Sequence, residues 1–261
     1  MHKNHGHLMH ERHADGTISD ETMVAQPSEV IGLYEETKLK AFKKVLNQLI
    51  LFLAHLPMSI PDNQGIEFSD VDEKMKVLSS ADMEFRQQLL QEQGVLTTVV
   101  TILELLNDNR TMDIAASSNE TPGASSSKKA SKKAKGVIEF EALKKEVSCA
   151  SLRLLYLAIL DNPESQMDLA DHLSTLIGYV PIDDSGYATE CITHMLSTNA
   201  ELQESKVKTK DIEYFITMIR NNPLSASYLE LLRSVCSCGG NGIDANQGRV
   251  VDMWLDQSKD L

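Results

Sequence analysis

The residues best suited to bind a metal are five histidines close to the N-terminus. They are His2, His5, His7, His10 and His13. Imidazole binds zinc, copper and nickel, and a spacing of three residues can bring two rings to one face of a helix. A metal site also requires packed neighbours that hold its ligands in place, and the sequence around these histidines has few apolar residues. We therefore expect a polar tail without a physiological metal site.

The four cysteines are the next candidate ligands. Cys236 and Cys238 are separated by one residue and resemble half of a zinc-binding pair, but Cys149 and Cys191 do not supply the second half. Four cysteines are also too few to form a disulfide framework in a chain of this length. We expect reduced thiols, with Cys236 and Cys238 packing at the end of a helix.

The acidic residues and glycines form no catalytic or cofactor-binding motif. Asp183 and Asp184, even together with Asp161 and Asp168, lack the glycine-centred loop that surrounds calcium. The sequence has no glycine-rich phosphate loop, no Gly-x-Ser-x-Gly and no His-Glu-x-x-His. We therefore predict no catalytic residues, no cofactor and no enzymatic activity.

A basic cluster lies near the middle of the chain and is flanked by serines. It consists of Lys128, Lys129, Lys132, Lys133 and Lys135. Such a cluster can direct nuclear import or hold anionic lipid, and phosphorylation of the serines would weaken either interaction. The same composition is typical of a solvated linker. We favour the linker and keep a regulatory role as the alternative.

The composition is that of an acidic, helix-forming chain. The 261 residues carry a net charge of −13, which argues against nucleic-acid binding because an acidic surface repels phosphate. Hydrophobic residues make up 42% and aromatic residues 5%, a balance that favours packed helices over sheets. The longest apolar run, Leu49 to Ala54, is far shorter than the roughly 20 residues that cross a bilayer, and the N-terminus has no signal-peptide pattern. We expect a cytosolic chain.

Apolar residues recur at intervals of three and four, as they do along one face of a helix. The pattern predicts a helix that begins near Leu33 and ends before Pro57, followed by a helical block from Val71 to Leu106 that Gly94 interrupts. The predicted buried stripe of this block is Met75, Leu78, Phe85, Leu89, Leu96, Val99, Leu103 and Leu106.

The pattern resumes in the second half of the chain. A helix is predicted from about Ile138 to Leu160, and Asn162 followed by Pro163 is suited to begin the next one. Shorter helices are predicted near 188–196, 209–220 and 223–236.

These elements predict one helical domain with a tail at each end. Residues 1–28 are expected to be disordered, 29–247 to form the domain, and 248–261 to be a tail or the start of a further segment. Residues 107–136 lose the apolar pattern and are expected to form a flexible insertion. Amphipathic helices with short connections stack on one another, and no repeat of fixed length is visible. We predict an all-α fold, an armadillo-like α-solenoid or irregular helical bundle.

Two stretches carry a family resemblance. The first is Phe85-Arg-Gln-Gln-Leu-Leu-Gln-Glu-Gln-Gly-Val-Leu96, and the second is Leu231-Leu-Arg-Ser-Val-Cys-Ser-Cys-Gly-Gly-Asn-Gly-Ile-Asp-Ala-Asn-Gln247. They resemble the beginning and the end of the RIH domain, the homology domain shared by inositol trisphosphate receptors and ryanodine receptors. The Cys-x-Cys and the closing Asn-Gln are most similar to the ryanodine-receptor form. The resemblance covers about Tyr34 to Gln247 and implies an armadillo-like module from the cytosolic part of a calcium-release channel.

The resemblance also implies where a ligand would bind, because two helices of this domain present cationic and tyrosine side chains to the phosphates in inositol trisphosphate receptors. The matching positions here are Gln88, Gln91, Gln166, Met167 and Asp168. A trisphosphate requires several charge-assisted contacts, and Arg86 is the remaining basic residue nearby. We therefore expect these positions not to bind inositol trisphosphate.

The function implied by the resemblance is that of a regulatory or scaffolding domain. It would contact other cytosolic domains or subunits of a calcium-release channel, at the cytosolic face of the endoplasmic reticulum membrane, and the chain would be a fragment or truncated relative. The alternative is a stand-alone armadillo-like adaptor that binds a peptide or a partner helix. Neither function involves nucleic acid or insertion of this chain into a membrane.

Overall fold

Helices account for almost all of the secondary structure. The computed structural model describes residues 27–56, 80–117, 127–221 and 225–256. Within these ranges the chain forms eleven α-helices and one antiparallel hairpin of two short strands. The expected all-α fold class is confirmed.

The helices differ greatly in length, and the longest lie in the N-terminal half. They are α1 (Pro27–Leu53), α3 (Ser80–Glu92), α4 (Val95–Ser117), α5 (Ser127–Ile159), α6 (Pro163–Ala170), α7 (Leu173–Tyr179), α8 (Tyr187–Thr198), α9 (Ala200–Lys206), α10 (Thr209–Asn221), α11 (Ala226–Cys236) and α12 (Asp244–Asp256). The strands β1 (Ser237–Cys238) and β2 (Asn241–Gly242) form the hairpin between α11 and α12.

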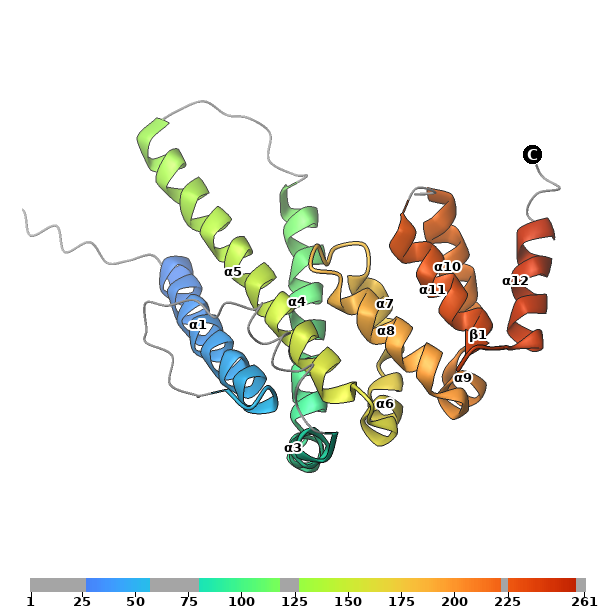
Figure 1. The fold of residues 1–261 in the computed structure, drawn as a ribbon. Helices are drawn as coiled ribbons and strands as arrows, with labels where there is room; N and C mark the ends of the chain where they lie inside the picture. Colours follow the sequence, from blue (N-terminus) through green and yellow to red (C-terminus); the bar gives the residue numbers. More distant parts are fainter. Residues whose placement is uncertain (1–26, 57–79, 118–126, 222–224, 257–261) are drawn as a thin grey trace, which may run out of the picture.

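The helices form three consecutive units with the same plan, which Figure 1 shows from left to right. Each unit has a first helix at the lower edge and two further helices above it: α3–α4–α5, α6–α7–α8 and α9–α10–α11. The third helices pack on one another in order, α5 against α8 and α8 against α11. Helix α1 packs on the outer side of α5, and α12 packs on α10 and α11. This stack is the armadillo-like arrangement.

Aliphatic side chains fill the space between the units. Leu46 and Ile50 of α1, Leu155 of α5 and Ile192 of α8 are buried in one continuous core. Such side chains come from the three- and four-residue periodicity of the sequence, since each helix turns one face towards its neighbours. The core therefore extends along the whole stack and is not confined to one unit.

One buried glutamine lies in the first helix of each unit. Gln87 of α3, Gln166 of α6 and Gln203 of α9 are 1%, 1% and 3% exposed. The last carbonyl groups of a helix have no partner within that helix. Gln87 Nε2 donates hydrogen bonds to two such carbonyls at the end of α5, those of Leu157 (2.9 Å) and Leu160 (2.8 Å).

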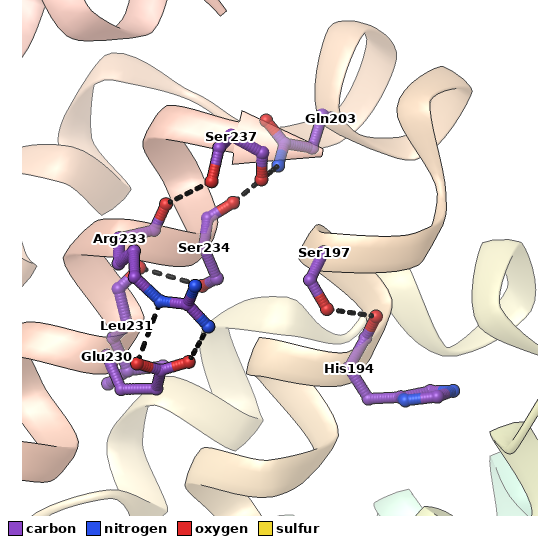
Figure 2. A network of polar contacts seen from close by, with 8 residues as sticks. All are labelled: His194, Ser197, Gln203, Glu230, Leu231, Arg233, Ser234 and Ser237. Carbon is purple, nitrogen blue, oxygen red and sulfur yellow. Dashed lines mark hydrogen bonds and ion pairs between the residues drawn. The ribbon is translucent and has the colours of Figure 1, made fainter. Parts of the chain in front are cut away.

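The other two glutamines make equivalent contacts. Gln166 Nε2 donates to the carbonyl of Ile159 (3.0 Å), and Gln203 Nε2 donates to the carbonyl of Leu196 (2.5 Å); each acceptor lies seven residues earlier, at the end of the preceding helix. Figure 2 shows that Gln203 also reaches the end of α11, where it donates to the carbonyl of Ser234 (2.5 Å). Gln166 and Gln203 therefore reach the end of a helix in the preceding unit, whereas Gln87 holds the end of α5 within its own unit.

Each glutamine is connected to the next unit or to α12 by one asparagine. The donors and acceptors are Asn162 Nδ2 to Gln87 Oε1 (3.4 Å), Asn199 Nδ2 to Gln166 Oε1 (3.2 Å) and Asn246 Nδ2 to Gln203 Oε1 (3.4 Å). Asn162 and Asn199 are also the N-caps of α6 and α9, as their Oδ1 atoms accept from the backbone three residues later. We call these three glutamines and three asparagines the amide chain.

The amide chain reveals a repeat within the sequence. Asn162-Pro-Glu-Ser-Gln166 and Asn199-Ala-Glu-Leu-Gln203 share the pattern Asn-x-Glu-x-Gln and occupy the same place in their units. Asn246 holds the asparagine position again, in the first turn of α12. The three-helix units differ in length, so the repeat has no constant period.

The structure confirms the predicted break at Gly94, which has a φ of +66° between α3 and α4. The two helices are bent by 63° there. Among the described residues, no single helix is long and apolar enough to cross a membrane; only the bent pair α3–α4 reaches that length and composition when taken together. The predicted first residues of the α6 helix, Asn162 and Pro163, are also confirmed.

Two expectations need correction. Residues 107–117 and 127–136 were expected to lack regular structure, but they continue α4 and begin α5; residues 118–126 lie outside the described ranges. Phe85 and Leu89 were expected to be buried, but they are 67% and 37% exposed because α3 turns the Gln87 face towards the core. Residues 1–26 and the predicted helical stretch 71–79 also lie outside the described part of the chain.

Replacing Gln203 tests whether the amide chain stabilises the stack. Gln203→Ala leaves the carbonyls of Leu196 and Ser234 buried without their donor, and we expect the free energy of unfolding to fall by about 2–4 kcal/mol. Chemical denaturation followed by circular dichroism measures the change. The matched control is Gln88→Ala, since Gln88 is exposed and donates to Glu92 on its own helix; we expect a change within about 0.5 kcal/mol. Equal effects of the two substitutions would contradict the role of the amide chain.

Candidate functional site

The positions matched to a ligand site lie on α3 and α6, which are neighbours along the lower edge of the stack (Figure 1). Gln91 Nε2 of α3 donates a hydrogen bond to Asp168 Oδ2 of α6 over 2.7 Å. Asp168 is exposed and Gln91 is half-buried. The structure therefore brings together two of the five predicted positions, and they bind each other.

The other three predicted positions have separate surroundings. Gln88 is exposed and its Nε2 donates to Glu92 Oε1 over 3.1 Å. Gln166 belongs to the buried amide chain, and Met167 is partly buried against the hydrophobic core. The second predicted helix thus contributes one exposed side chain of the three, the carboxylate of Asp168.

Arg86 is the only lysine or arginine within α3 and α6, and it is bound to α1. Its Nη1 donates to the carbonyl of Phe52 (2.7 Å), and its guanidinium lies 5.3 Å from the centre of the Phe52 ring. Phe52 is next to the last residue of α1, where free carbonyls and the helix dipole attract a cation. Arg86 therefore fastens α3 to the end of α1.

This arrangement is unsuited to a polyanion. A phosphate group placed between α3 and α6 would meet the Asp168 carboxylate and would have to replace the hydrogen bond from Gln91. It would find neutral amide donors instead of the cations that compensate for desolvation of several negative charges. The Gln91–Asp168 hydrogen bond at the α3–α6 edge instead connects the first unit to the second.

The predicted basic cluster falls on the first turns of α5. The backbone of Lys128, Lys129, Lys132, Lys133 and Lys135 is helical, while their side chains lie outside the described residues. The histidine tract lies outside them altogether. In the described part of the chain, no group of three or more histidine, cysteine, aspartate or glutamate side chains is arranged to hold a metal ion.

Cys236 and Cys238 lie where α11 meets the hairpin. Cys236 is the last residue of α11, and Cys238 belongs to β1. Burial raises the pKa of both thiols, so they are less readily ionised than a free cysteine. Gln247 Nε2 donates to the carbonyl of Cys236 (3.0 Å). Asn246 Nδ2 donates to the carbonyl of Val235 (3.0 Å). Asn246 and Gln247, which close the second stretch with the family resemblance, thus supply hydrogen bonds to the last carbonyls of α11.

His194 was not singled out by its sequence, yet it forms a contact between α5 and α8. Asp161 has a φ of +51° in the turn after α5, and its N–H donates to His194 Nε2 over 3.3 Å. The imidazole also lies edge-on to Tyr156, with ring centres 6.2 Å apart. Figure 2 shows His194 on α8, with the hydroxyl of Ser197 donating to its carbonyl. Only the tertiary structure reveals this contact, because Asp161 and His194 are far apart in the sequence.

Comparison with known proteins agrees with the fold. The family model of the RIH domain matches residues 67–261, which is well over half of the chain and includes α3 to α12. No curated protein matches the chain. The match thus contains all three units and the complete amide chain.

The pH dependence of stability tests the His194 contact. Burial lowers the pKa of His194 below its ordinary value of 6.5, against a smaller opposing effect of Asp161. The unfolded chain then binds the proton more readily, so this contribution to stability is complete above pH 6.5 and decreases as the pH falls below it. We expect His194→Gln, which keeps an acceptor but does not titrate, to reduce the loss of stability between about pH 7 and about pH 5.

Urea denaturation at several pH values measures this difference. His55→Gln serves as the control, since His55 is exposed just after α1 and does not contact Asp161. The control should keep the pH dependence of the wild type. A His194→Gln curve parallel to that of the wild type would exclude the assigned contact.

Proposed function

Since the chain belongs to the RIH domain family, we propose that it is a regulatory and scaffolding domain of an intracellular calcium-release channel. In this role it contacts other cytosolic domains or subunits of the channel and does not bind inositol trisphosphate. The observation that carries the proposal is the hydrogen bond between Gln91 and Asp168, which occupies the edge where a ligand would need cations. In this proposal the domain lies at the cytosolic face of the endoplasmic reticulum membrane, within a larger assembly.

The amide chain supports a mechanical role. Gln166 donates to the end of α5 and to Thr198 at the end of α8, and Gln203 donates to the ends of α8 and α11. A displacement of one unit therefore pulls on hydrogen bonds of the next. Packed helices joined in this way move as rigid bodies more readily than they bend. A stack of this kind can carry a shift from a contact at one end to a contact at the other.

The surface of α12 supports a role in protein contacts. Val251, Trp254 and Leu255 are 52%, 42% and 57% exposed, and their spacing places them on one side of the helix. The guanidinium of Arg220 on α10 lies 5.6 Å from the centre of the Trp254 ring. Tryptophan and arginine are enriched at protein interfaces, where they supply much of the binding energy. We assign the channel contact to this face.

Titration with inositol trisphosphate tests the absence of a ligand site. We expect isothermal titration calorimetry to detect no binding tighter than about 10 μM, or about −7 kcal/mol. A double variant, Gln91→Lys with Asp168→Lys, should bind more tightly than the wild type because it replaces an amide and a carboxylate with two cations. Wild-type binding below about 10 μM would contradict our reading of the α3–α6 edge.

Association with channel domains tests the scaffolding role. The full chain should co-elute in size-exclusion chromatography, and be retained in pull-downs, with cytosolic domains of an inositol trisphosphate receptor or a ryanodine receptor. Trp254→Ala should weaken that association at least about tenfold. Leu105→Ala is the control, since Leu105 is 57% exposed on α4 and does not belong to the α12 face. Association with none of these domains would overturn the proposal and favour the adaptor.

A further inference from the structure

The outer face of α3 carries two exposed apolar side chains. Phe85 is 67% exposed, more than any other aromatic residue whose side chain the structure describes, and Leu89 is 37% exposed. Their spacing of four residues places them next to each other on one side of the helix. Single exposed apolar residues are common on protein surfaces. An adjacent pair that includes a phenylalanine is instead typical of the anchors that are buried when two proteins bind.

The other sides of α3 are held by neighbouring helices, and this fixes the direction of the pair. Gln87 donates to the end of α5 in the interior, Arg86 fastens α3 to the end of α1, and Gln91 donates to α6. In a helix of about 3.6 residues per turn, Gln87 lies opposite the middle of the Phe85–Leu89 pair. Helix α3 also lies at the lower edge of the stack (Figure 1). The pair is therefore turned outward on a helix whose position is fixed on its other sides.

The charges around the pair are mainly negative. Glu92 lies one turn after Leu89 and accepts a hydrogen bond from the neutral amide of Gln88. Asp168 on the neighbouring α6 accepts from the neutral amide of Gln91, so neither carboxylate loses its charge to that partner. Helices α3 and α6 together hold one arginine, Arg86, and five acidic residues, which are Asp82, Glu84, Glu92, Glu164 and Asp168. The outer face of α3 thus combines an apolar contact with a negative potential.

We propose that the outer face of α3 binds a basic amphipathic helix of a partner protein. Apolar residues of the partner, spaced three and four apart, cover Phe85 and Leu89, as in other complexes in which a helix docks through its apolar side. Lysine or arginine residues beside that apolar stripe lie next to Glu92 and Asp168. Opposite charges of this kind steer association and fix the orientation of the partner.

The same charges disfavour other occupants of this face. A second copy of the chain, with its net charge of −13, would bring its own carboxylates against these in a symmetric contact. Anionic lipid and nucleic acid are repelled for the same reason. The proposal is independent of the contact assigned to α12, because α3 belongs to the first unit and α12 follows the third.

Binding of a model helix to the full chain tests the proposal. The probe is a fluorescein-labelled peptide made of two copies of Leu-Lys-Lys-Leu-Leu-Lys-Leu, which places leucines on one side of a helix and lysines on the other. A second peptide has alanine in place of every leucine and keeps the charge and the helix propensity. A third has glutamate in place of every lysine and keeps the leucines. Fluorescence anisotropy at nanomolar peptide concentration and physiological salt gives the Kd of each.

We expect the leucine–lysine peptide to bind the wild type with a Kd below about 100 μM. The alanine and glutamate peptides should bind at least about tenfold more weakly, since each lacks one of the two complementary features. Phe85→Ala, at an exposed position that leaves the core intact, should weaken binding of the leucine–lysine peptide at least about tenfold. Leu105→Ala is the control, because Leu105 is 57% exposed on α4, and it should bind like the wild type. Wild-type affinity in Phe85→Ala, or no binding to the wild type, would overturn the proposal.

The contribution of the carboxylates has its own pair of variants. Glu92→Gln with Asp168→Asn removes two negative charges and keeps the oxygen that accepts from Gln91, so it should weaken binding and make it less dependent on salt. Glu204→Gln with Glu213→Gln removes the same charge from exposed positions on α9 and α10 and should retain the affinity of the wild type. Equal loss of affinity in the two double variants would show that only the net charge matters and would overturn the assignment to α3.

Light scattering after size-exclusion chromatography distinguishes a partner helix from a second copy of the chain. We expect the wild type and Phe85→Ala to have the same mass. A wild-type dimer that Phe85→Ala dissociates would show that the face binds another copy of this chain, contrary to the proposal.

Discussion

The buried carbonyl groups at the ends of α5 and α8 are the constraint on which the stack depends. A helix that ends against another unit leaves several carbonyls without partners, and water cannot reach them there. Leu157 and Leu196 place such carbonyls in the interior, and Leu160 places one at its margin. A glutamine side chain is long enough to reach them and carries two donors, while its oxygen remains free for an asparagine. Each joint between units thus contains a pair of amides beside the aliphatic core.

The same constraint determines what the α3–α6 edge can do. Gln87 and Gln166 belong to these helices, and both are used to satisfy carbonyls in the interior. The outer side of the edge then carries Gln91, Asp168 and further exposed carboxylates such as Glu92 and Glu164, with Arg86 directed to the end of α1. On its inner side the edge is held by Gln87 and Gln166, and on its outer side by the hydrogen bond between Gln91 and Asp168. It therefore has little freedom to rearrange around a ligand.

The sequence predicts the helices well because periodicity, Gly94 and the Asn162-Pro163 pair act locally. It does not predict the amide chain, since glutamine is ordinarily a surface residue and Gln87, Gln88 and Gln91 look alike in one dimension. Their different environments arise from the direction in which α3 turns, which also exposes Phe85 and Leu89. The extent of α4 and α5 was underestimated for another reason: a lysine- and serine-rich segment can form a helix without an apolar face. The Gln91–Asp168 contact cannot be predicted from a local pattern, because the two residues lie on different helices that are far apart in the sequence.

The unequal lengths of the third helices have a consequence for how such a chain can vary. Helix α5 has 33 residues, whereas α8 has 12 and α11 has 11, yet all three end on the same edge and are held there by equivalent amides. The extra turns of α5 extend away from that edge, as Figure 1 shows at its upper left. Material can therefore be inserted or removed at the far end of the α4–α5 pair without altering the register of the units. The edge where α5, α8 and α11 end sets the order of the units, whereas the opposite edge can vary in helix length.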